Sequence, residues 1–236
     1  MTAALVLVLL AAGVEPVWVG KFGGSGSLPA PWRLVRLGKV KPTAYRAASV
    51  DGIGAIMANA DSSMALLARP IAVDLAATPI LCWRWRIDAP VAAADLRRKR
   101  GDDYAARVYV AFAMPDAAMS AGTRFKLGMA RQLFGAAVPD AALNYVWDNR
   151  NPVGTRARSS YTDRAELIVA ESGAGKEGER VEARADIRAD FAKAFGEQPG
   201  KPVQLAIASD TDNTRSKARA AFADLHFVAP SSRCQF

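Results

Sequence analysis

PILCWRWRID at residues 79–88 and GDDYAARVYVAF at residues 101–112 predict two strands around which the rest of the chain is arranged. Both stretches are rich in β-branched and aromatic residues and alternate with period two, which is typical of half-buried strands. Trp83 and Trp85 therefore point to one face, and Arg84 and Arg86 point to the other. We expect both strands to lie in one sheet, with the tryptophans in the core.

The second strand places arginine on its polar face as well. Val108 and Val110 alternate with Arg107 and Tyr109, so the valines are predicted to face the core. Since two successive strands carry arginine away from the core, we predict a single polar sheet face. Its candidate ligand-binding residues are Arg84, Arg86, Asp103, Arg107, Tyr109 and Asn144.

The remaining chain reads as many short strands separated by turn residues, with little helix. This pattern predicts an all-β fold, a two-sheet β-sandwich of jelly-roll type, formed by one domain over residues 20–236. One or two short surface helices are expected, at residues 123–134 and from Asp186 to Gly196. Residues 165–172 and 178–185 are predicted to form a hairpin. In the last strand, we expect Phe222, Asp224 and His226 to share a face.

Composition limits the class of partner. Half of the 236 residues are hydrophobic (51%), which suits a sizeable core. The formal net charge of +8 invites a nucleic-acid interpretation. The basic residues are dispersed, however, acidic residues are interleaved with them, and the sequence contains no recognised nucleic-acid-binding motif. We therefore predict no specific nucleic-acid partner.

The first residues indicate export. The apolar run from Ala3 to Val14 is too short to span a bilayer, but its length fits the apolar region of a secretory signal peptide. The small residues at 11–13 offer a cleavage site. We interpret residues 1–19 as a signal peptide and lead-in, and predict a periplasmic or secreted protein without a membrane span. The alternative is an apolar first strand. In an oxidising compartment Cys82 and Cys234 can form a bridge, although Cys82 equally fits a buried thiol.

Five motifs occur in an order that resembles a known bacterial family. They are Trp83–Arg86, Gly101–Arg107, Leu143–Trp147, Asp190–Phe191 with Ala194–Glu197, and Asp210–Thr214. The chain resembles the family named only as domain of unknown function 3047, and the resemblance covers nearly everything after the lead-in. It implies an exported β-sandwich of unassigned activity. Arg180 stands where this family resemblance leads us to expect Trp, and Ala223 stands where it leads us to expect Gly.

The polar face supports two interpretations. Arginine can donate hydrogen bonds to carboxylates and hydroxyls, so the face can form a groove that binds an acidic or neutral glycan. It can instead be an internal network of ion pairs that holds the sheets together, because a buried arginine needs a carboxylate partner in any case.

Other residues suggest an enzyme or a metal site. Asp102 and Asp103, paired with Glu171 or Glu182, would suit glycoside hydrolysis, and Tyr109 beside Arg107 would suit a polysaccharide lyase. His226 is the only histidine and is interpreted as structural. Asp210, Asp212 and Asn213 offer the oxygen ligands that Ca²⁺ prefers, in a turn that Asx hydrogen bonds alone also explain. The sequence carries no cofactor fingerprint. We therefore expect a non-catalytic glycan-binding protein, with polysaccharide cleavage as the alternative.

Overall fold

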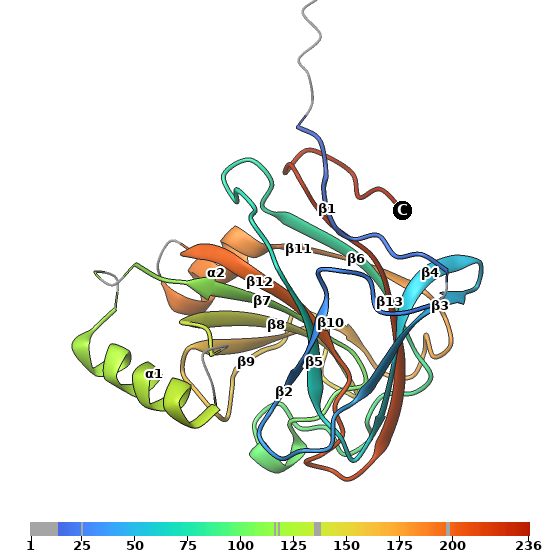
Figure 1. Ribbon diagram of the computed structural model, residues 1–236, viewed down its shortest axis with the longest axis horizontal. Coiled ribbons are helices and arrows are strands. Elements are labelled where there is room, and N and C mark those ends of the chain that lie inside the picture. Colours follow the sequence, from blue (N-terminus) through green and yellow to red (C-terminus); the bar gives the residue numbers. More distant parts are fainter. Residues whose placement is uncertain (1–13, 25, 116, 118, 135–137, 197–198) are drawn as a thin grey trace, which may run out of the picture.

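The strand-and-turn pattern produces a β-sandwich. The computed structural model describes residues 14–236 except 25, 116, 118, 135–137 and 197–198. These residues form two sheets with short helices at their ends, as Figure 1 shows. The apolar run of the predicted signal peptide falls almost wholly in residues 1–13, which lie outside the described residues. In the described part of the chain, no helix combines the length and hydropathy of a bilayer-spanning segment.

The first sheet, called sheet A, has the strand order β11-β6-β13-β4-β3, with β1 pairing beside β13. Its strands are β1 (Val17–Gly20), β3 (Ala44–Val50), β4 (Ile53–Asp61), β6 (Ile80–Ile87), β11 (Val181–Asp186) and β13 (Lys217–Val228). Because β1 pairs with β13, the segment expected to be a lead-in supplies an edge strand. The first and last described strands are therefore neighbours (Figure 1).

The second sheet, called sheet B, has the order β2-β5-β12-β7-β8-β10-β9. Its strands are β2 (Arg33–Arg36), β5 (Ala65–Pro70), β7 (Arg107–Ala113), β8 (Ala141–Asp148), β9 (Arg156–Arg158), β10 (Ala165–Ser172) and β12 (Lys201–Ala208). Neighbouring strands run antiparallel except β8 and β10, which are parallel. The long connection through β9 makes this parallel pair possible.

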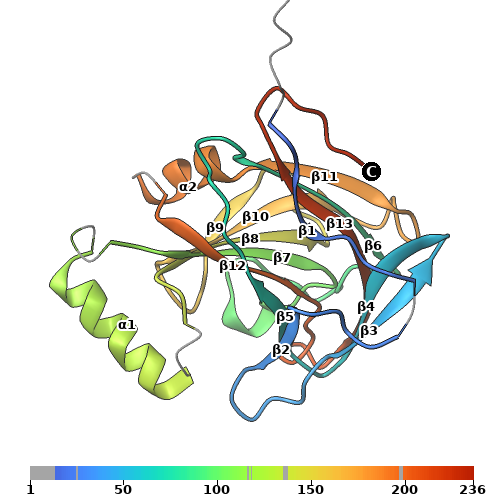
Figure 2. The same cartoon turned by 45° about the horizontal axis from the view of Figure 1, so that its top comes forward.

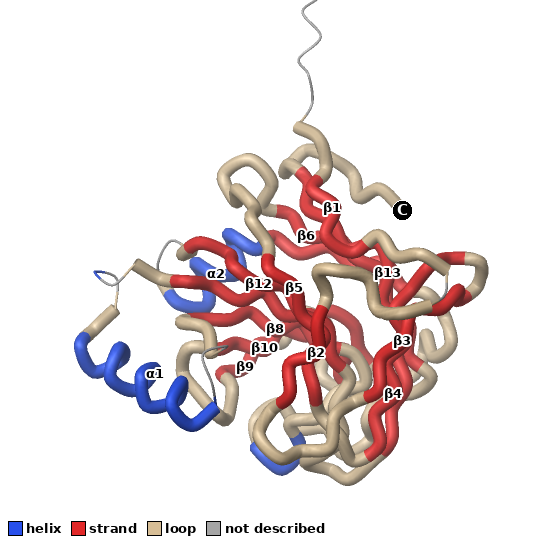
Figure 3. The backbone as a smooth tube through the Cα atoms, in the orientation of Figure 1, coloured by secondary structure: helices blue, strands red, loops and turns tan. Residues whose placement is uncertain are grey.

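Aromatic residues from both sheets fill the core. Trp83 and Trp85 are 0% and 1% exposed, which confirms the predicted orientation of their strand. Their rings lie 5.4 Å from Tyr145 and 5.7 Å from Trp147, respectively, so β6 packs face to face with β8. Figure 3 shows the strands gathered into these two layers.

The expectation that the two defining strands share a sheet is wrong. β6 belongs to sheet A and β7 belongs to sheet B. Both strands have one apolar face, and those faces meet across the core. Period two identifies the buried face of each strand but does not assign the strand to a sheet. The predicted hairpin of residues 165–172 and 178–185 is also wrong, because β10 pairs with β8 whereas β11 pairs with β6.

A bulge in β13 changes the predicted face of its residues. The pairing of β13 with β6 shifts between Ala223 and His226, and Asp224 has a φ of 54°. One extra residue at this point inverts the alternation of the strand. Phe222, Leu225 and Phe227 consequently all enter the core, and Phe222 does not share a face with His226. Asp224 lies outside the core, where it pairs with Arg84 of β6.

Both predicted helices are present. Helix α1 (Ala121–Phe134) stands apart from the sheets in Figures 1 and 2, and exposes Phe125 and Met129. Helix α2 (Ile187–Phe195) begins at Asp186, whose carboxylate accepts a hydrogen bond from the amide of Ala189, and it ends at Gly196 in the left-handed conformation. Short 3₁₀ helix η1 (Lys99–Gly101) precedes β7.

Candidate functional site

The predicted polar face is divided between the two sheets. Arg84 and Arg86 lie on the outer face of sheet A, whereas Arg107, Tyr109 and Asn144 lie on the outer face of sheet B. The expectation of one shared face is therefore wrong, because the core separates the two groups. Each group forms its own polar site, and the two sites differ in burial.

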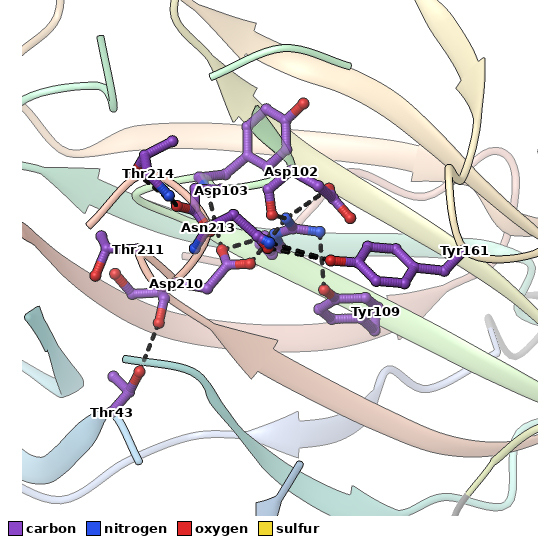
Figure 4. Close-up of polar contacts among 12 residues, drawn as sticks. Thr43, Asp102, Asp103, Tyr109, Tyr161, Asp210, Thr211, Asn213 and Thr214 are labelled. Atoms are coloured by element: carbon purple, nitrogen blue, oxygen red, sulfur yellow. Dashed lines mark hydrogen bonds and ion pairs between the residues drawn. The ribbon is translucent and has the colours of Figure 1, made fainter. Parts of the chain in front are cut away.

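Arg107 is the centre of a closed network on sheet B. Figure 4 shows its partners Asp102, Tyr109 and Asp210. Its Nε donates to Asp210 Oδ1 at 2.8 Å, and its Nη1 donates to the hydroxyl of Tyr109 at 3.0 Å. Its Nη2 donates to the carbonyl and carboxylate of Asp102 at 2.6 and 2.8 Å and lies 2.8 Å from Asp210 Oδ2. The Tyr104 ring lies 4.5 Å from the guanidinium carbon. The guanidinium is thus satisfied by protein groups.

The Arg107 network is buried. The Arg107 side chain is only 3% exposed and that of Asp210 is 4% exposed. Burial raises the pKa of Asp210 to about 8; Arg107 opposes this rise, and the charges of Asp102 and Asp103 add to it. Burial also raises the pKa of Tyr109 well above its ordinary value, although Arg107 again acts in the opposite direction. This site therefore matches the alternative interpretation, an internal ion-pair network.

Asp103, which precedes β7, forms hydrogen bonds to the turn at residues 210–214. Its carboxylate accepts hydrogen bonds from the amides of Asn213 and Thr214, at 3.3 and 2.6 Å, and from the Thr214 hydroxyl at 2.6 Å. Asn213 instead turns its side chain to the hydroxyl of Tyr161, at 3.1 Å. The turn is thus fixed by an acid from another loop, which the local sequence does not reveal.

The predicted Ca²⁺ ligands are only partly brought together. Carboxylate oxygens of Asp103, Asp210 and Asp212 lie within 4.8 Å of one another, but Asn213 faces Tyr161. The oxygens of Asp103 and Asp210 already accept hydrogen bonds from Thr214 and from Arg107 and the Tyr104 amide. These contacts favour a structural role for the acids, and Ca²⁺ binding stays a prediction.

The acids considered for glycoside hydrolysis are dispersed, whereas Tyr109 and Arg107, considered for a lyase, are in contact but Arg107 is enclosed by the protein. Glu171 of β10 pairs with Lys176 at 2.7 Å, and Glu182 of β11 lies opposite Arg84 on the other sheet. His226 donates from Nδ1 to the Asp224 carbonyl at 2.7 Å, and its Nε2 accepts the Gln235 amide at 2.9 Å. Both nitrogens of His226 are occupied, in agreement with a structural role.

Asn144 is the exception on sheet B. It is 3% exposed, and its Oδ1 has no hydrogen-bond partner among the described residues. Its Cα partner in the pairing of β7 and β8 is Tyr109. One unpaired buried acceptor is compatible with an ordered water, and it does not by itself define a ligand site.

The outer face of sheet A carries a shallow depression with a floor of small residues. Ala55, Ala221 and Ala223 form this floor, separate from the main core. Val50 and Ile53 line one side, and three arginines line the depression as well: Arg84, Arg86 and Arg180. The three alanines are themselves buried, and the depression has a volume of only about 10 Å³, so it is a dimple and not a deep groove. The arginines around it supply hydrogen-bond donors.

The arginines of the depression differ in how well they are paired. Arg84 is bound to Asp224, with Nε 2.7 Å from Oδ2, and both side chains are largely buried. Arg86 and Arg180 share Asp51, whose Oδ2 lies 3.8 Å from Arg86 Nη1 and 3.3 Å from Arg180 Nη2. Asp51 is 55% exposed, and Arg86 Nε has no partner among the described residues.

The sequence indicated only part of this depression. Alternation in β6 correctly placed Arg84 and Arg86 away from the core. It did not indicate Asp51, Arg180 or Asp224, which come from a turn, a loop and a bulge. The only local signal was the Asp51–Gly52 turn, in which both residues have positive φ. The two departures from the family resemblance, Arg180 and Ala223, both line the depression.

A comparison with protein families accounts for most of the chain. A family model described as "Protein of unknown function (DUF3047)" matches residues 30–226. The chain belongs to the DUF3047 family. The match begins before β2 and ends within β13, so residues 227–236 of this DUF3047 chain lie outside it. No curated protein matches the sequence.

Two solved structures are distantly similar to this DUF3047 chain. One is a family 30 carbohydrate-binding module of a cellulosomal cellulase from Clostridium thermocellum, with 10% identity, a TM-score of 0.43, and coverage of 93% of this chain and 100% of that one. The other is the xyloglucanase domain of NopAA, a type three effector from Sinorhizobium fredii, in complex with cellobiose. It has 10% identity, a TM-score of 0.41, and coverage of 87% and 97%.

Proposed function

We propose that this protein is an exported, non-catalytic binding protein for a glycan that carries carboxylates, and that the glycan binds in the depression on sheet A. One observation carries the proposal. Arg86 and Arg180 face a single carboxylate, that of Asp51, which is half exposed at distances of 3.8 and 3.3 Å. Arg180 Nη2 also donates to the Val50 carbonyl at 2.6 Å, and its other guanidinium nitrogens keep donors for an incoming anion.

The chemistry of a uronic acid fits these groups. A guanidinium binds a carboxylate through two parallel hydrogen bonds, and the charge strengthens both. The uronate carboxylate would displace Asp51, and the sugar ring would lie above the depression, which is too small to enclose it. Because Asp51 is already solvated, its displacement costs less than the separation of a buried pair such as Arg84 and Asp224.

Export is supported by the apolar run at residues 3–14 and by the cysteines. Cys82 and Cys234 form a disulfide, and no free cysteine is present among the described residues. Disulfides persist in oxidising compartments such as the periplasm or the medium. Polysaccharides are met in the same compartments.

Binding without cleavage follows from the state of the acids. Asp224 is held by Arg84, and Asp51 is a half-exposed carboxylate that the ligand would displace, so the proposal gives neither of them the role of general acid. On the other sheet, Arg107 and Asp210 are enclosed by the protein. Incubation with an acidic polysaccharide should therefore yield neither shorter nor unsaturated products, and the appearance of either would favour the cleavage alternative.

Calorimetry with uronate oligosaccharides and their carboxyl-reduced counterparts tests the proposal. We expect the acidic form to bind and the reduced form to bind at least about tenfold more weakly. Arg86→Ala and Arg180→Ala should each lower the affinity by about tenfold or more without a large change in melting temperature. Arg33→Ala on sheet B, which removes an exposed arginine far from the depression, is the control. Unchanged binding in both depression variants would refute the site.

A further inference from the structure

A second cavity lies on the same face as the depression. It has a volume of about 330 Å³ and is open to solvent between β11 and the segment 229–236. Its lining residues are Glu182, Ala183, Arg184, Arg233, Cys234 and Phe236. Arg84 connects the two hollows, because it lines the depression and its guanidinium carbon lies 5.2 Å from the Phe236 ring centre.

Three successive residues fix the segment at this cavity. Cys234 is bonded to Cys82 of β6, and the Gln235 amide donates to His226 Nε2 at 2.9 Å. The Phe236 ring stands edge-on to the His226 ring, with 5.5 Å between their centres. Farther back, Arg184 donates to the carbonyl of Pro230 at 2.9 Å.

His226 is itself held in the form that accepts this hydrogen bond. Its Nδ1–H donates to the Asp224 carbonyl, so Nε2 carries the lone pair that receives the Gln235 amide. Trp18 of β1 stacks on the imidazole, with 4.4 Å between ring centres. Burial lowers the pKa of His226, and this keeps the ring neutral. The segment therefore rests on a rigid support.

Phe236 remains exposed although it is held so closely. It is 41% exposed, next to an open cavity and next to the arginines of the depression. A fixed aromatic ring offers a flat apolar surface at little further cost in conformational entropy. Beside it, Glu182 and Arg233 supply an acceptor and donors at the cavity. An apolar surface with a few polar groups around it is the usual composition of a small-molecule subsite.

We propose that Phe236 is the stacking platform of a second sugar subsite, and that the glycan runs from the Arg86–Arg180 depression across Arg84 to this ring. Glu182 and Arg233 bind hydroxyl groups of the sugar stacked there. The inference rests on the proposed function and adds chain-length selectivity to it. A single uronic acid contacts only the arginines of the depression, whereas an oligosaccharide reaches both subsites. The disulfide positions the platform.

The test compares Phe236→Ala and Phe236→Trp with the unmodified protein. A single uronic acid and a uronate oligosaccharide serve as ligands, followed by nuclear magnetic resonance titration and calorimetry. We expect Phe236→Ala to weaken oligosaccharide binding by about tenfold and to change binding of the single acid by less than about twofold. Phe236→Trp should retain the oligosaccharide affinity. Phe125→Ala, which removes another exposed aromatic ring, on α1, is the matched control.

Reduction of the disulfide gives an independent measurement. It should release the segment and reproduce the selective loss of oligosaccharide affinity, with tryptophan fluorescence confirming that the sandwich stays folded. Two results separate the inference from the proposed function. If Arg86→Ala abolishes binding but Phe236→Ala changes no affinity, the second subsite is refuted and the depression stands. If neither uronate ligand binds the unmodified protein, the proposed function fails and the subsite fails with it.

Discussion

Replacement of Arg107 by alanine should destabilise the fold. The guanidinium is 3% exposed and contacts two carboxylates, a carbonyl and a tyrosine hydroxyl. Without it, Asp210 and Asp102 would be left beside each other with no buried cation. Asp210 would keep the Tyr104 amide as a donor, at 3.0 Å, which cannot replace a guanidinium.

The expected magnitude follows from the burial. Removing one partner of a buried ion pair costs about 3–5 kcal/mol. Here Asp102 would lose its cation and Asp210 would lose its guanidinium donors, and both would stay desolvated. For a domain of this size, each kcal/mol lowers the melting temperature by about 2–4 °C. The variant should therefore melt about 6–20 °C below the unmodified protein. Such a loss is a large part of the typical free energy of unfolding, about 5–15 kcal/mol.

Urea unfolding followed by tryptophan fluorescence measures this loss, since Trp83, Trp85 and Trp147 are buried and report on the core. Arg33→Ala serves as the exposed control and should change the free energy of unfolding by no more than about 0.5 kcal/mol. Combining Arg107→Met with Asp210→Leu should recover part of the stability, because the buried acid at 210 is removed together with its partner, although Asp102 still lacks a cation. An Arg107→Ala protein that unfolds at the urea concentration of the unmodified protein would refute the buried network.

Three further outcomes are expected. Trp83→Ala should lower the free energy of unfolding by about 3–5 kcal/mol, measured by calorimetry, because it removes a buried side chain. Trp83→Phe should cost less, because the indole N–H that it removes has no partner among the described residues. A near-neutral alanine variant would contradict the core assignment. The folded-state pKa of Asp210 is raised to about 8, above about 3.9 for an unfolded aspartate, so its contribution to stability is full below about pH 4 and is lost as the pH rises towards about 8. Asp210→Asn should remove that slope from urea unfolding measured across this range, and an unchanged slope would assign it to another group. Fractionation of the native host should find a mature protein without its first residues in the periplasm or medium, whereas a full-length cytoplasmic protein would contradict export.

The architecture was predictable because alternation is a local property. Period two in residues 80–87 and 107–112 fixed the buried faces of β6 and β7, and Asp186 and Gly196 marked the limits of α2. Strand pairing is not local. Nothing in the short sequence around β10 distinguishes a hairpin with β11 from the parallel pairing with β8 that the structure contains.

The candidate site shows the same limit more clearly. Arg84 and Arg86 were identified because they alternate with tryptophans, but their partners Asp224 and Asp51 lie far away in the sequence. Arg107 was identified by the same pattern and proved to be enclosed, because loops carrying Asp102 and Asp210 meet over it. The alternation of a strand distinguishes its core face from its outer face. Whether the outer face is exposed to solvent depends on loops elsewhere in the chain, which the strand sequence does not predict.

The bulge at Asp224 makes the length of β13 matter more than the identity of most of its residues. Leu225 and Phe227 enter the core, and His226 faces outward, only because one residue breaks the alternation. Deleting that single residue would turn the end of the strand inside out and leave Arg84 without its carboxylate. In related proteins, β13 is therefore expected to vary in sequence but not to contain insertions or deletions at the bulge.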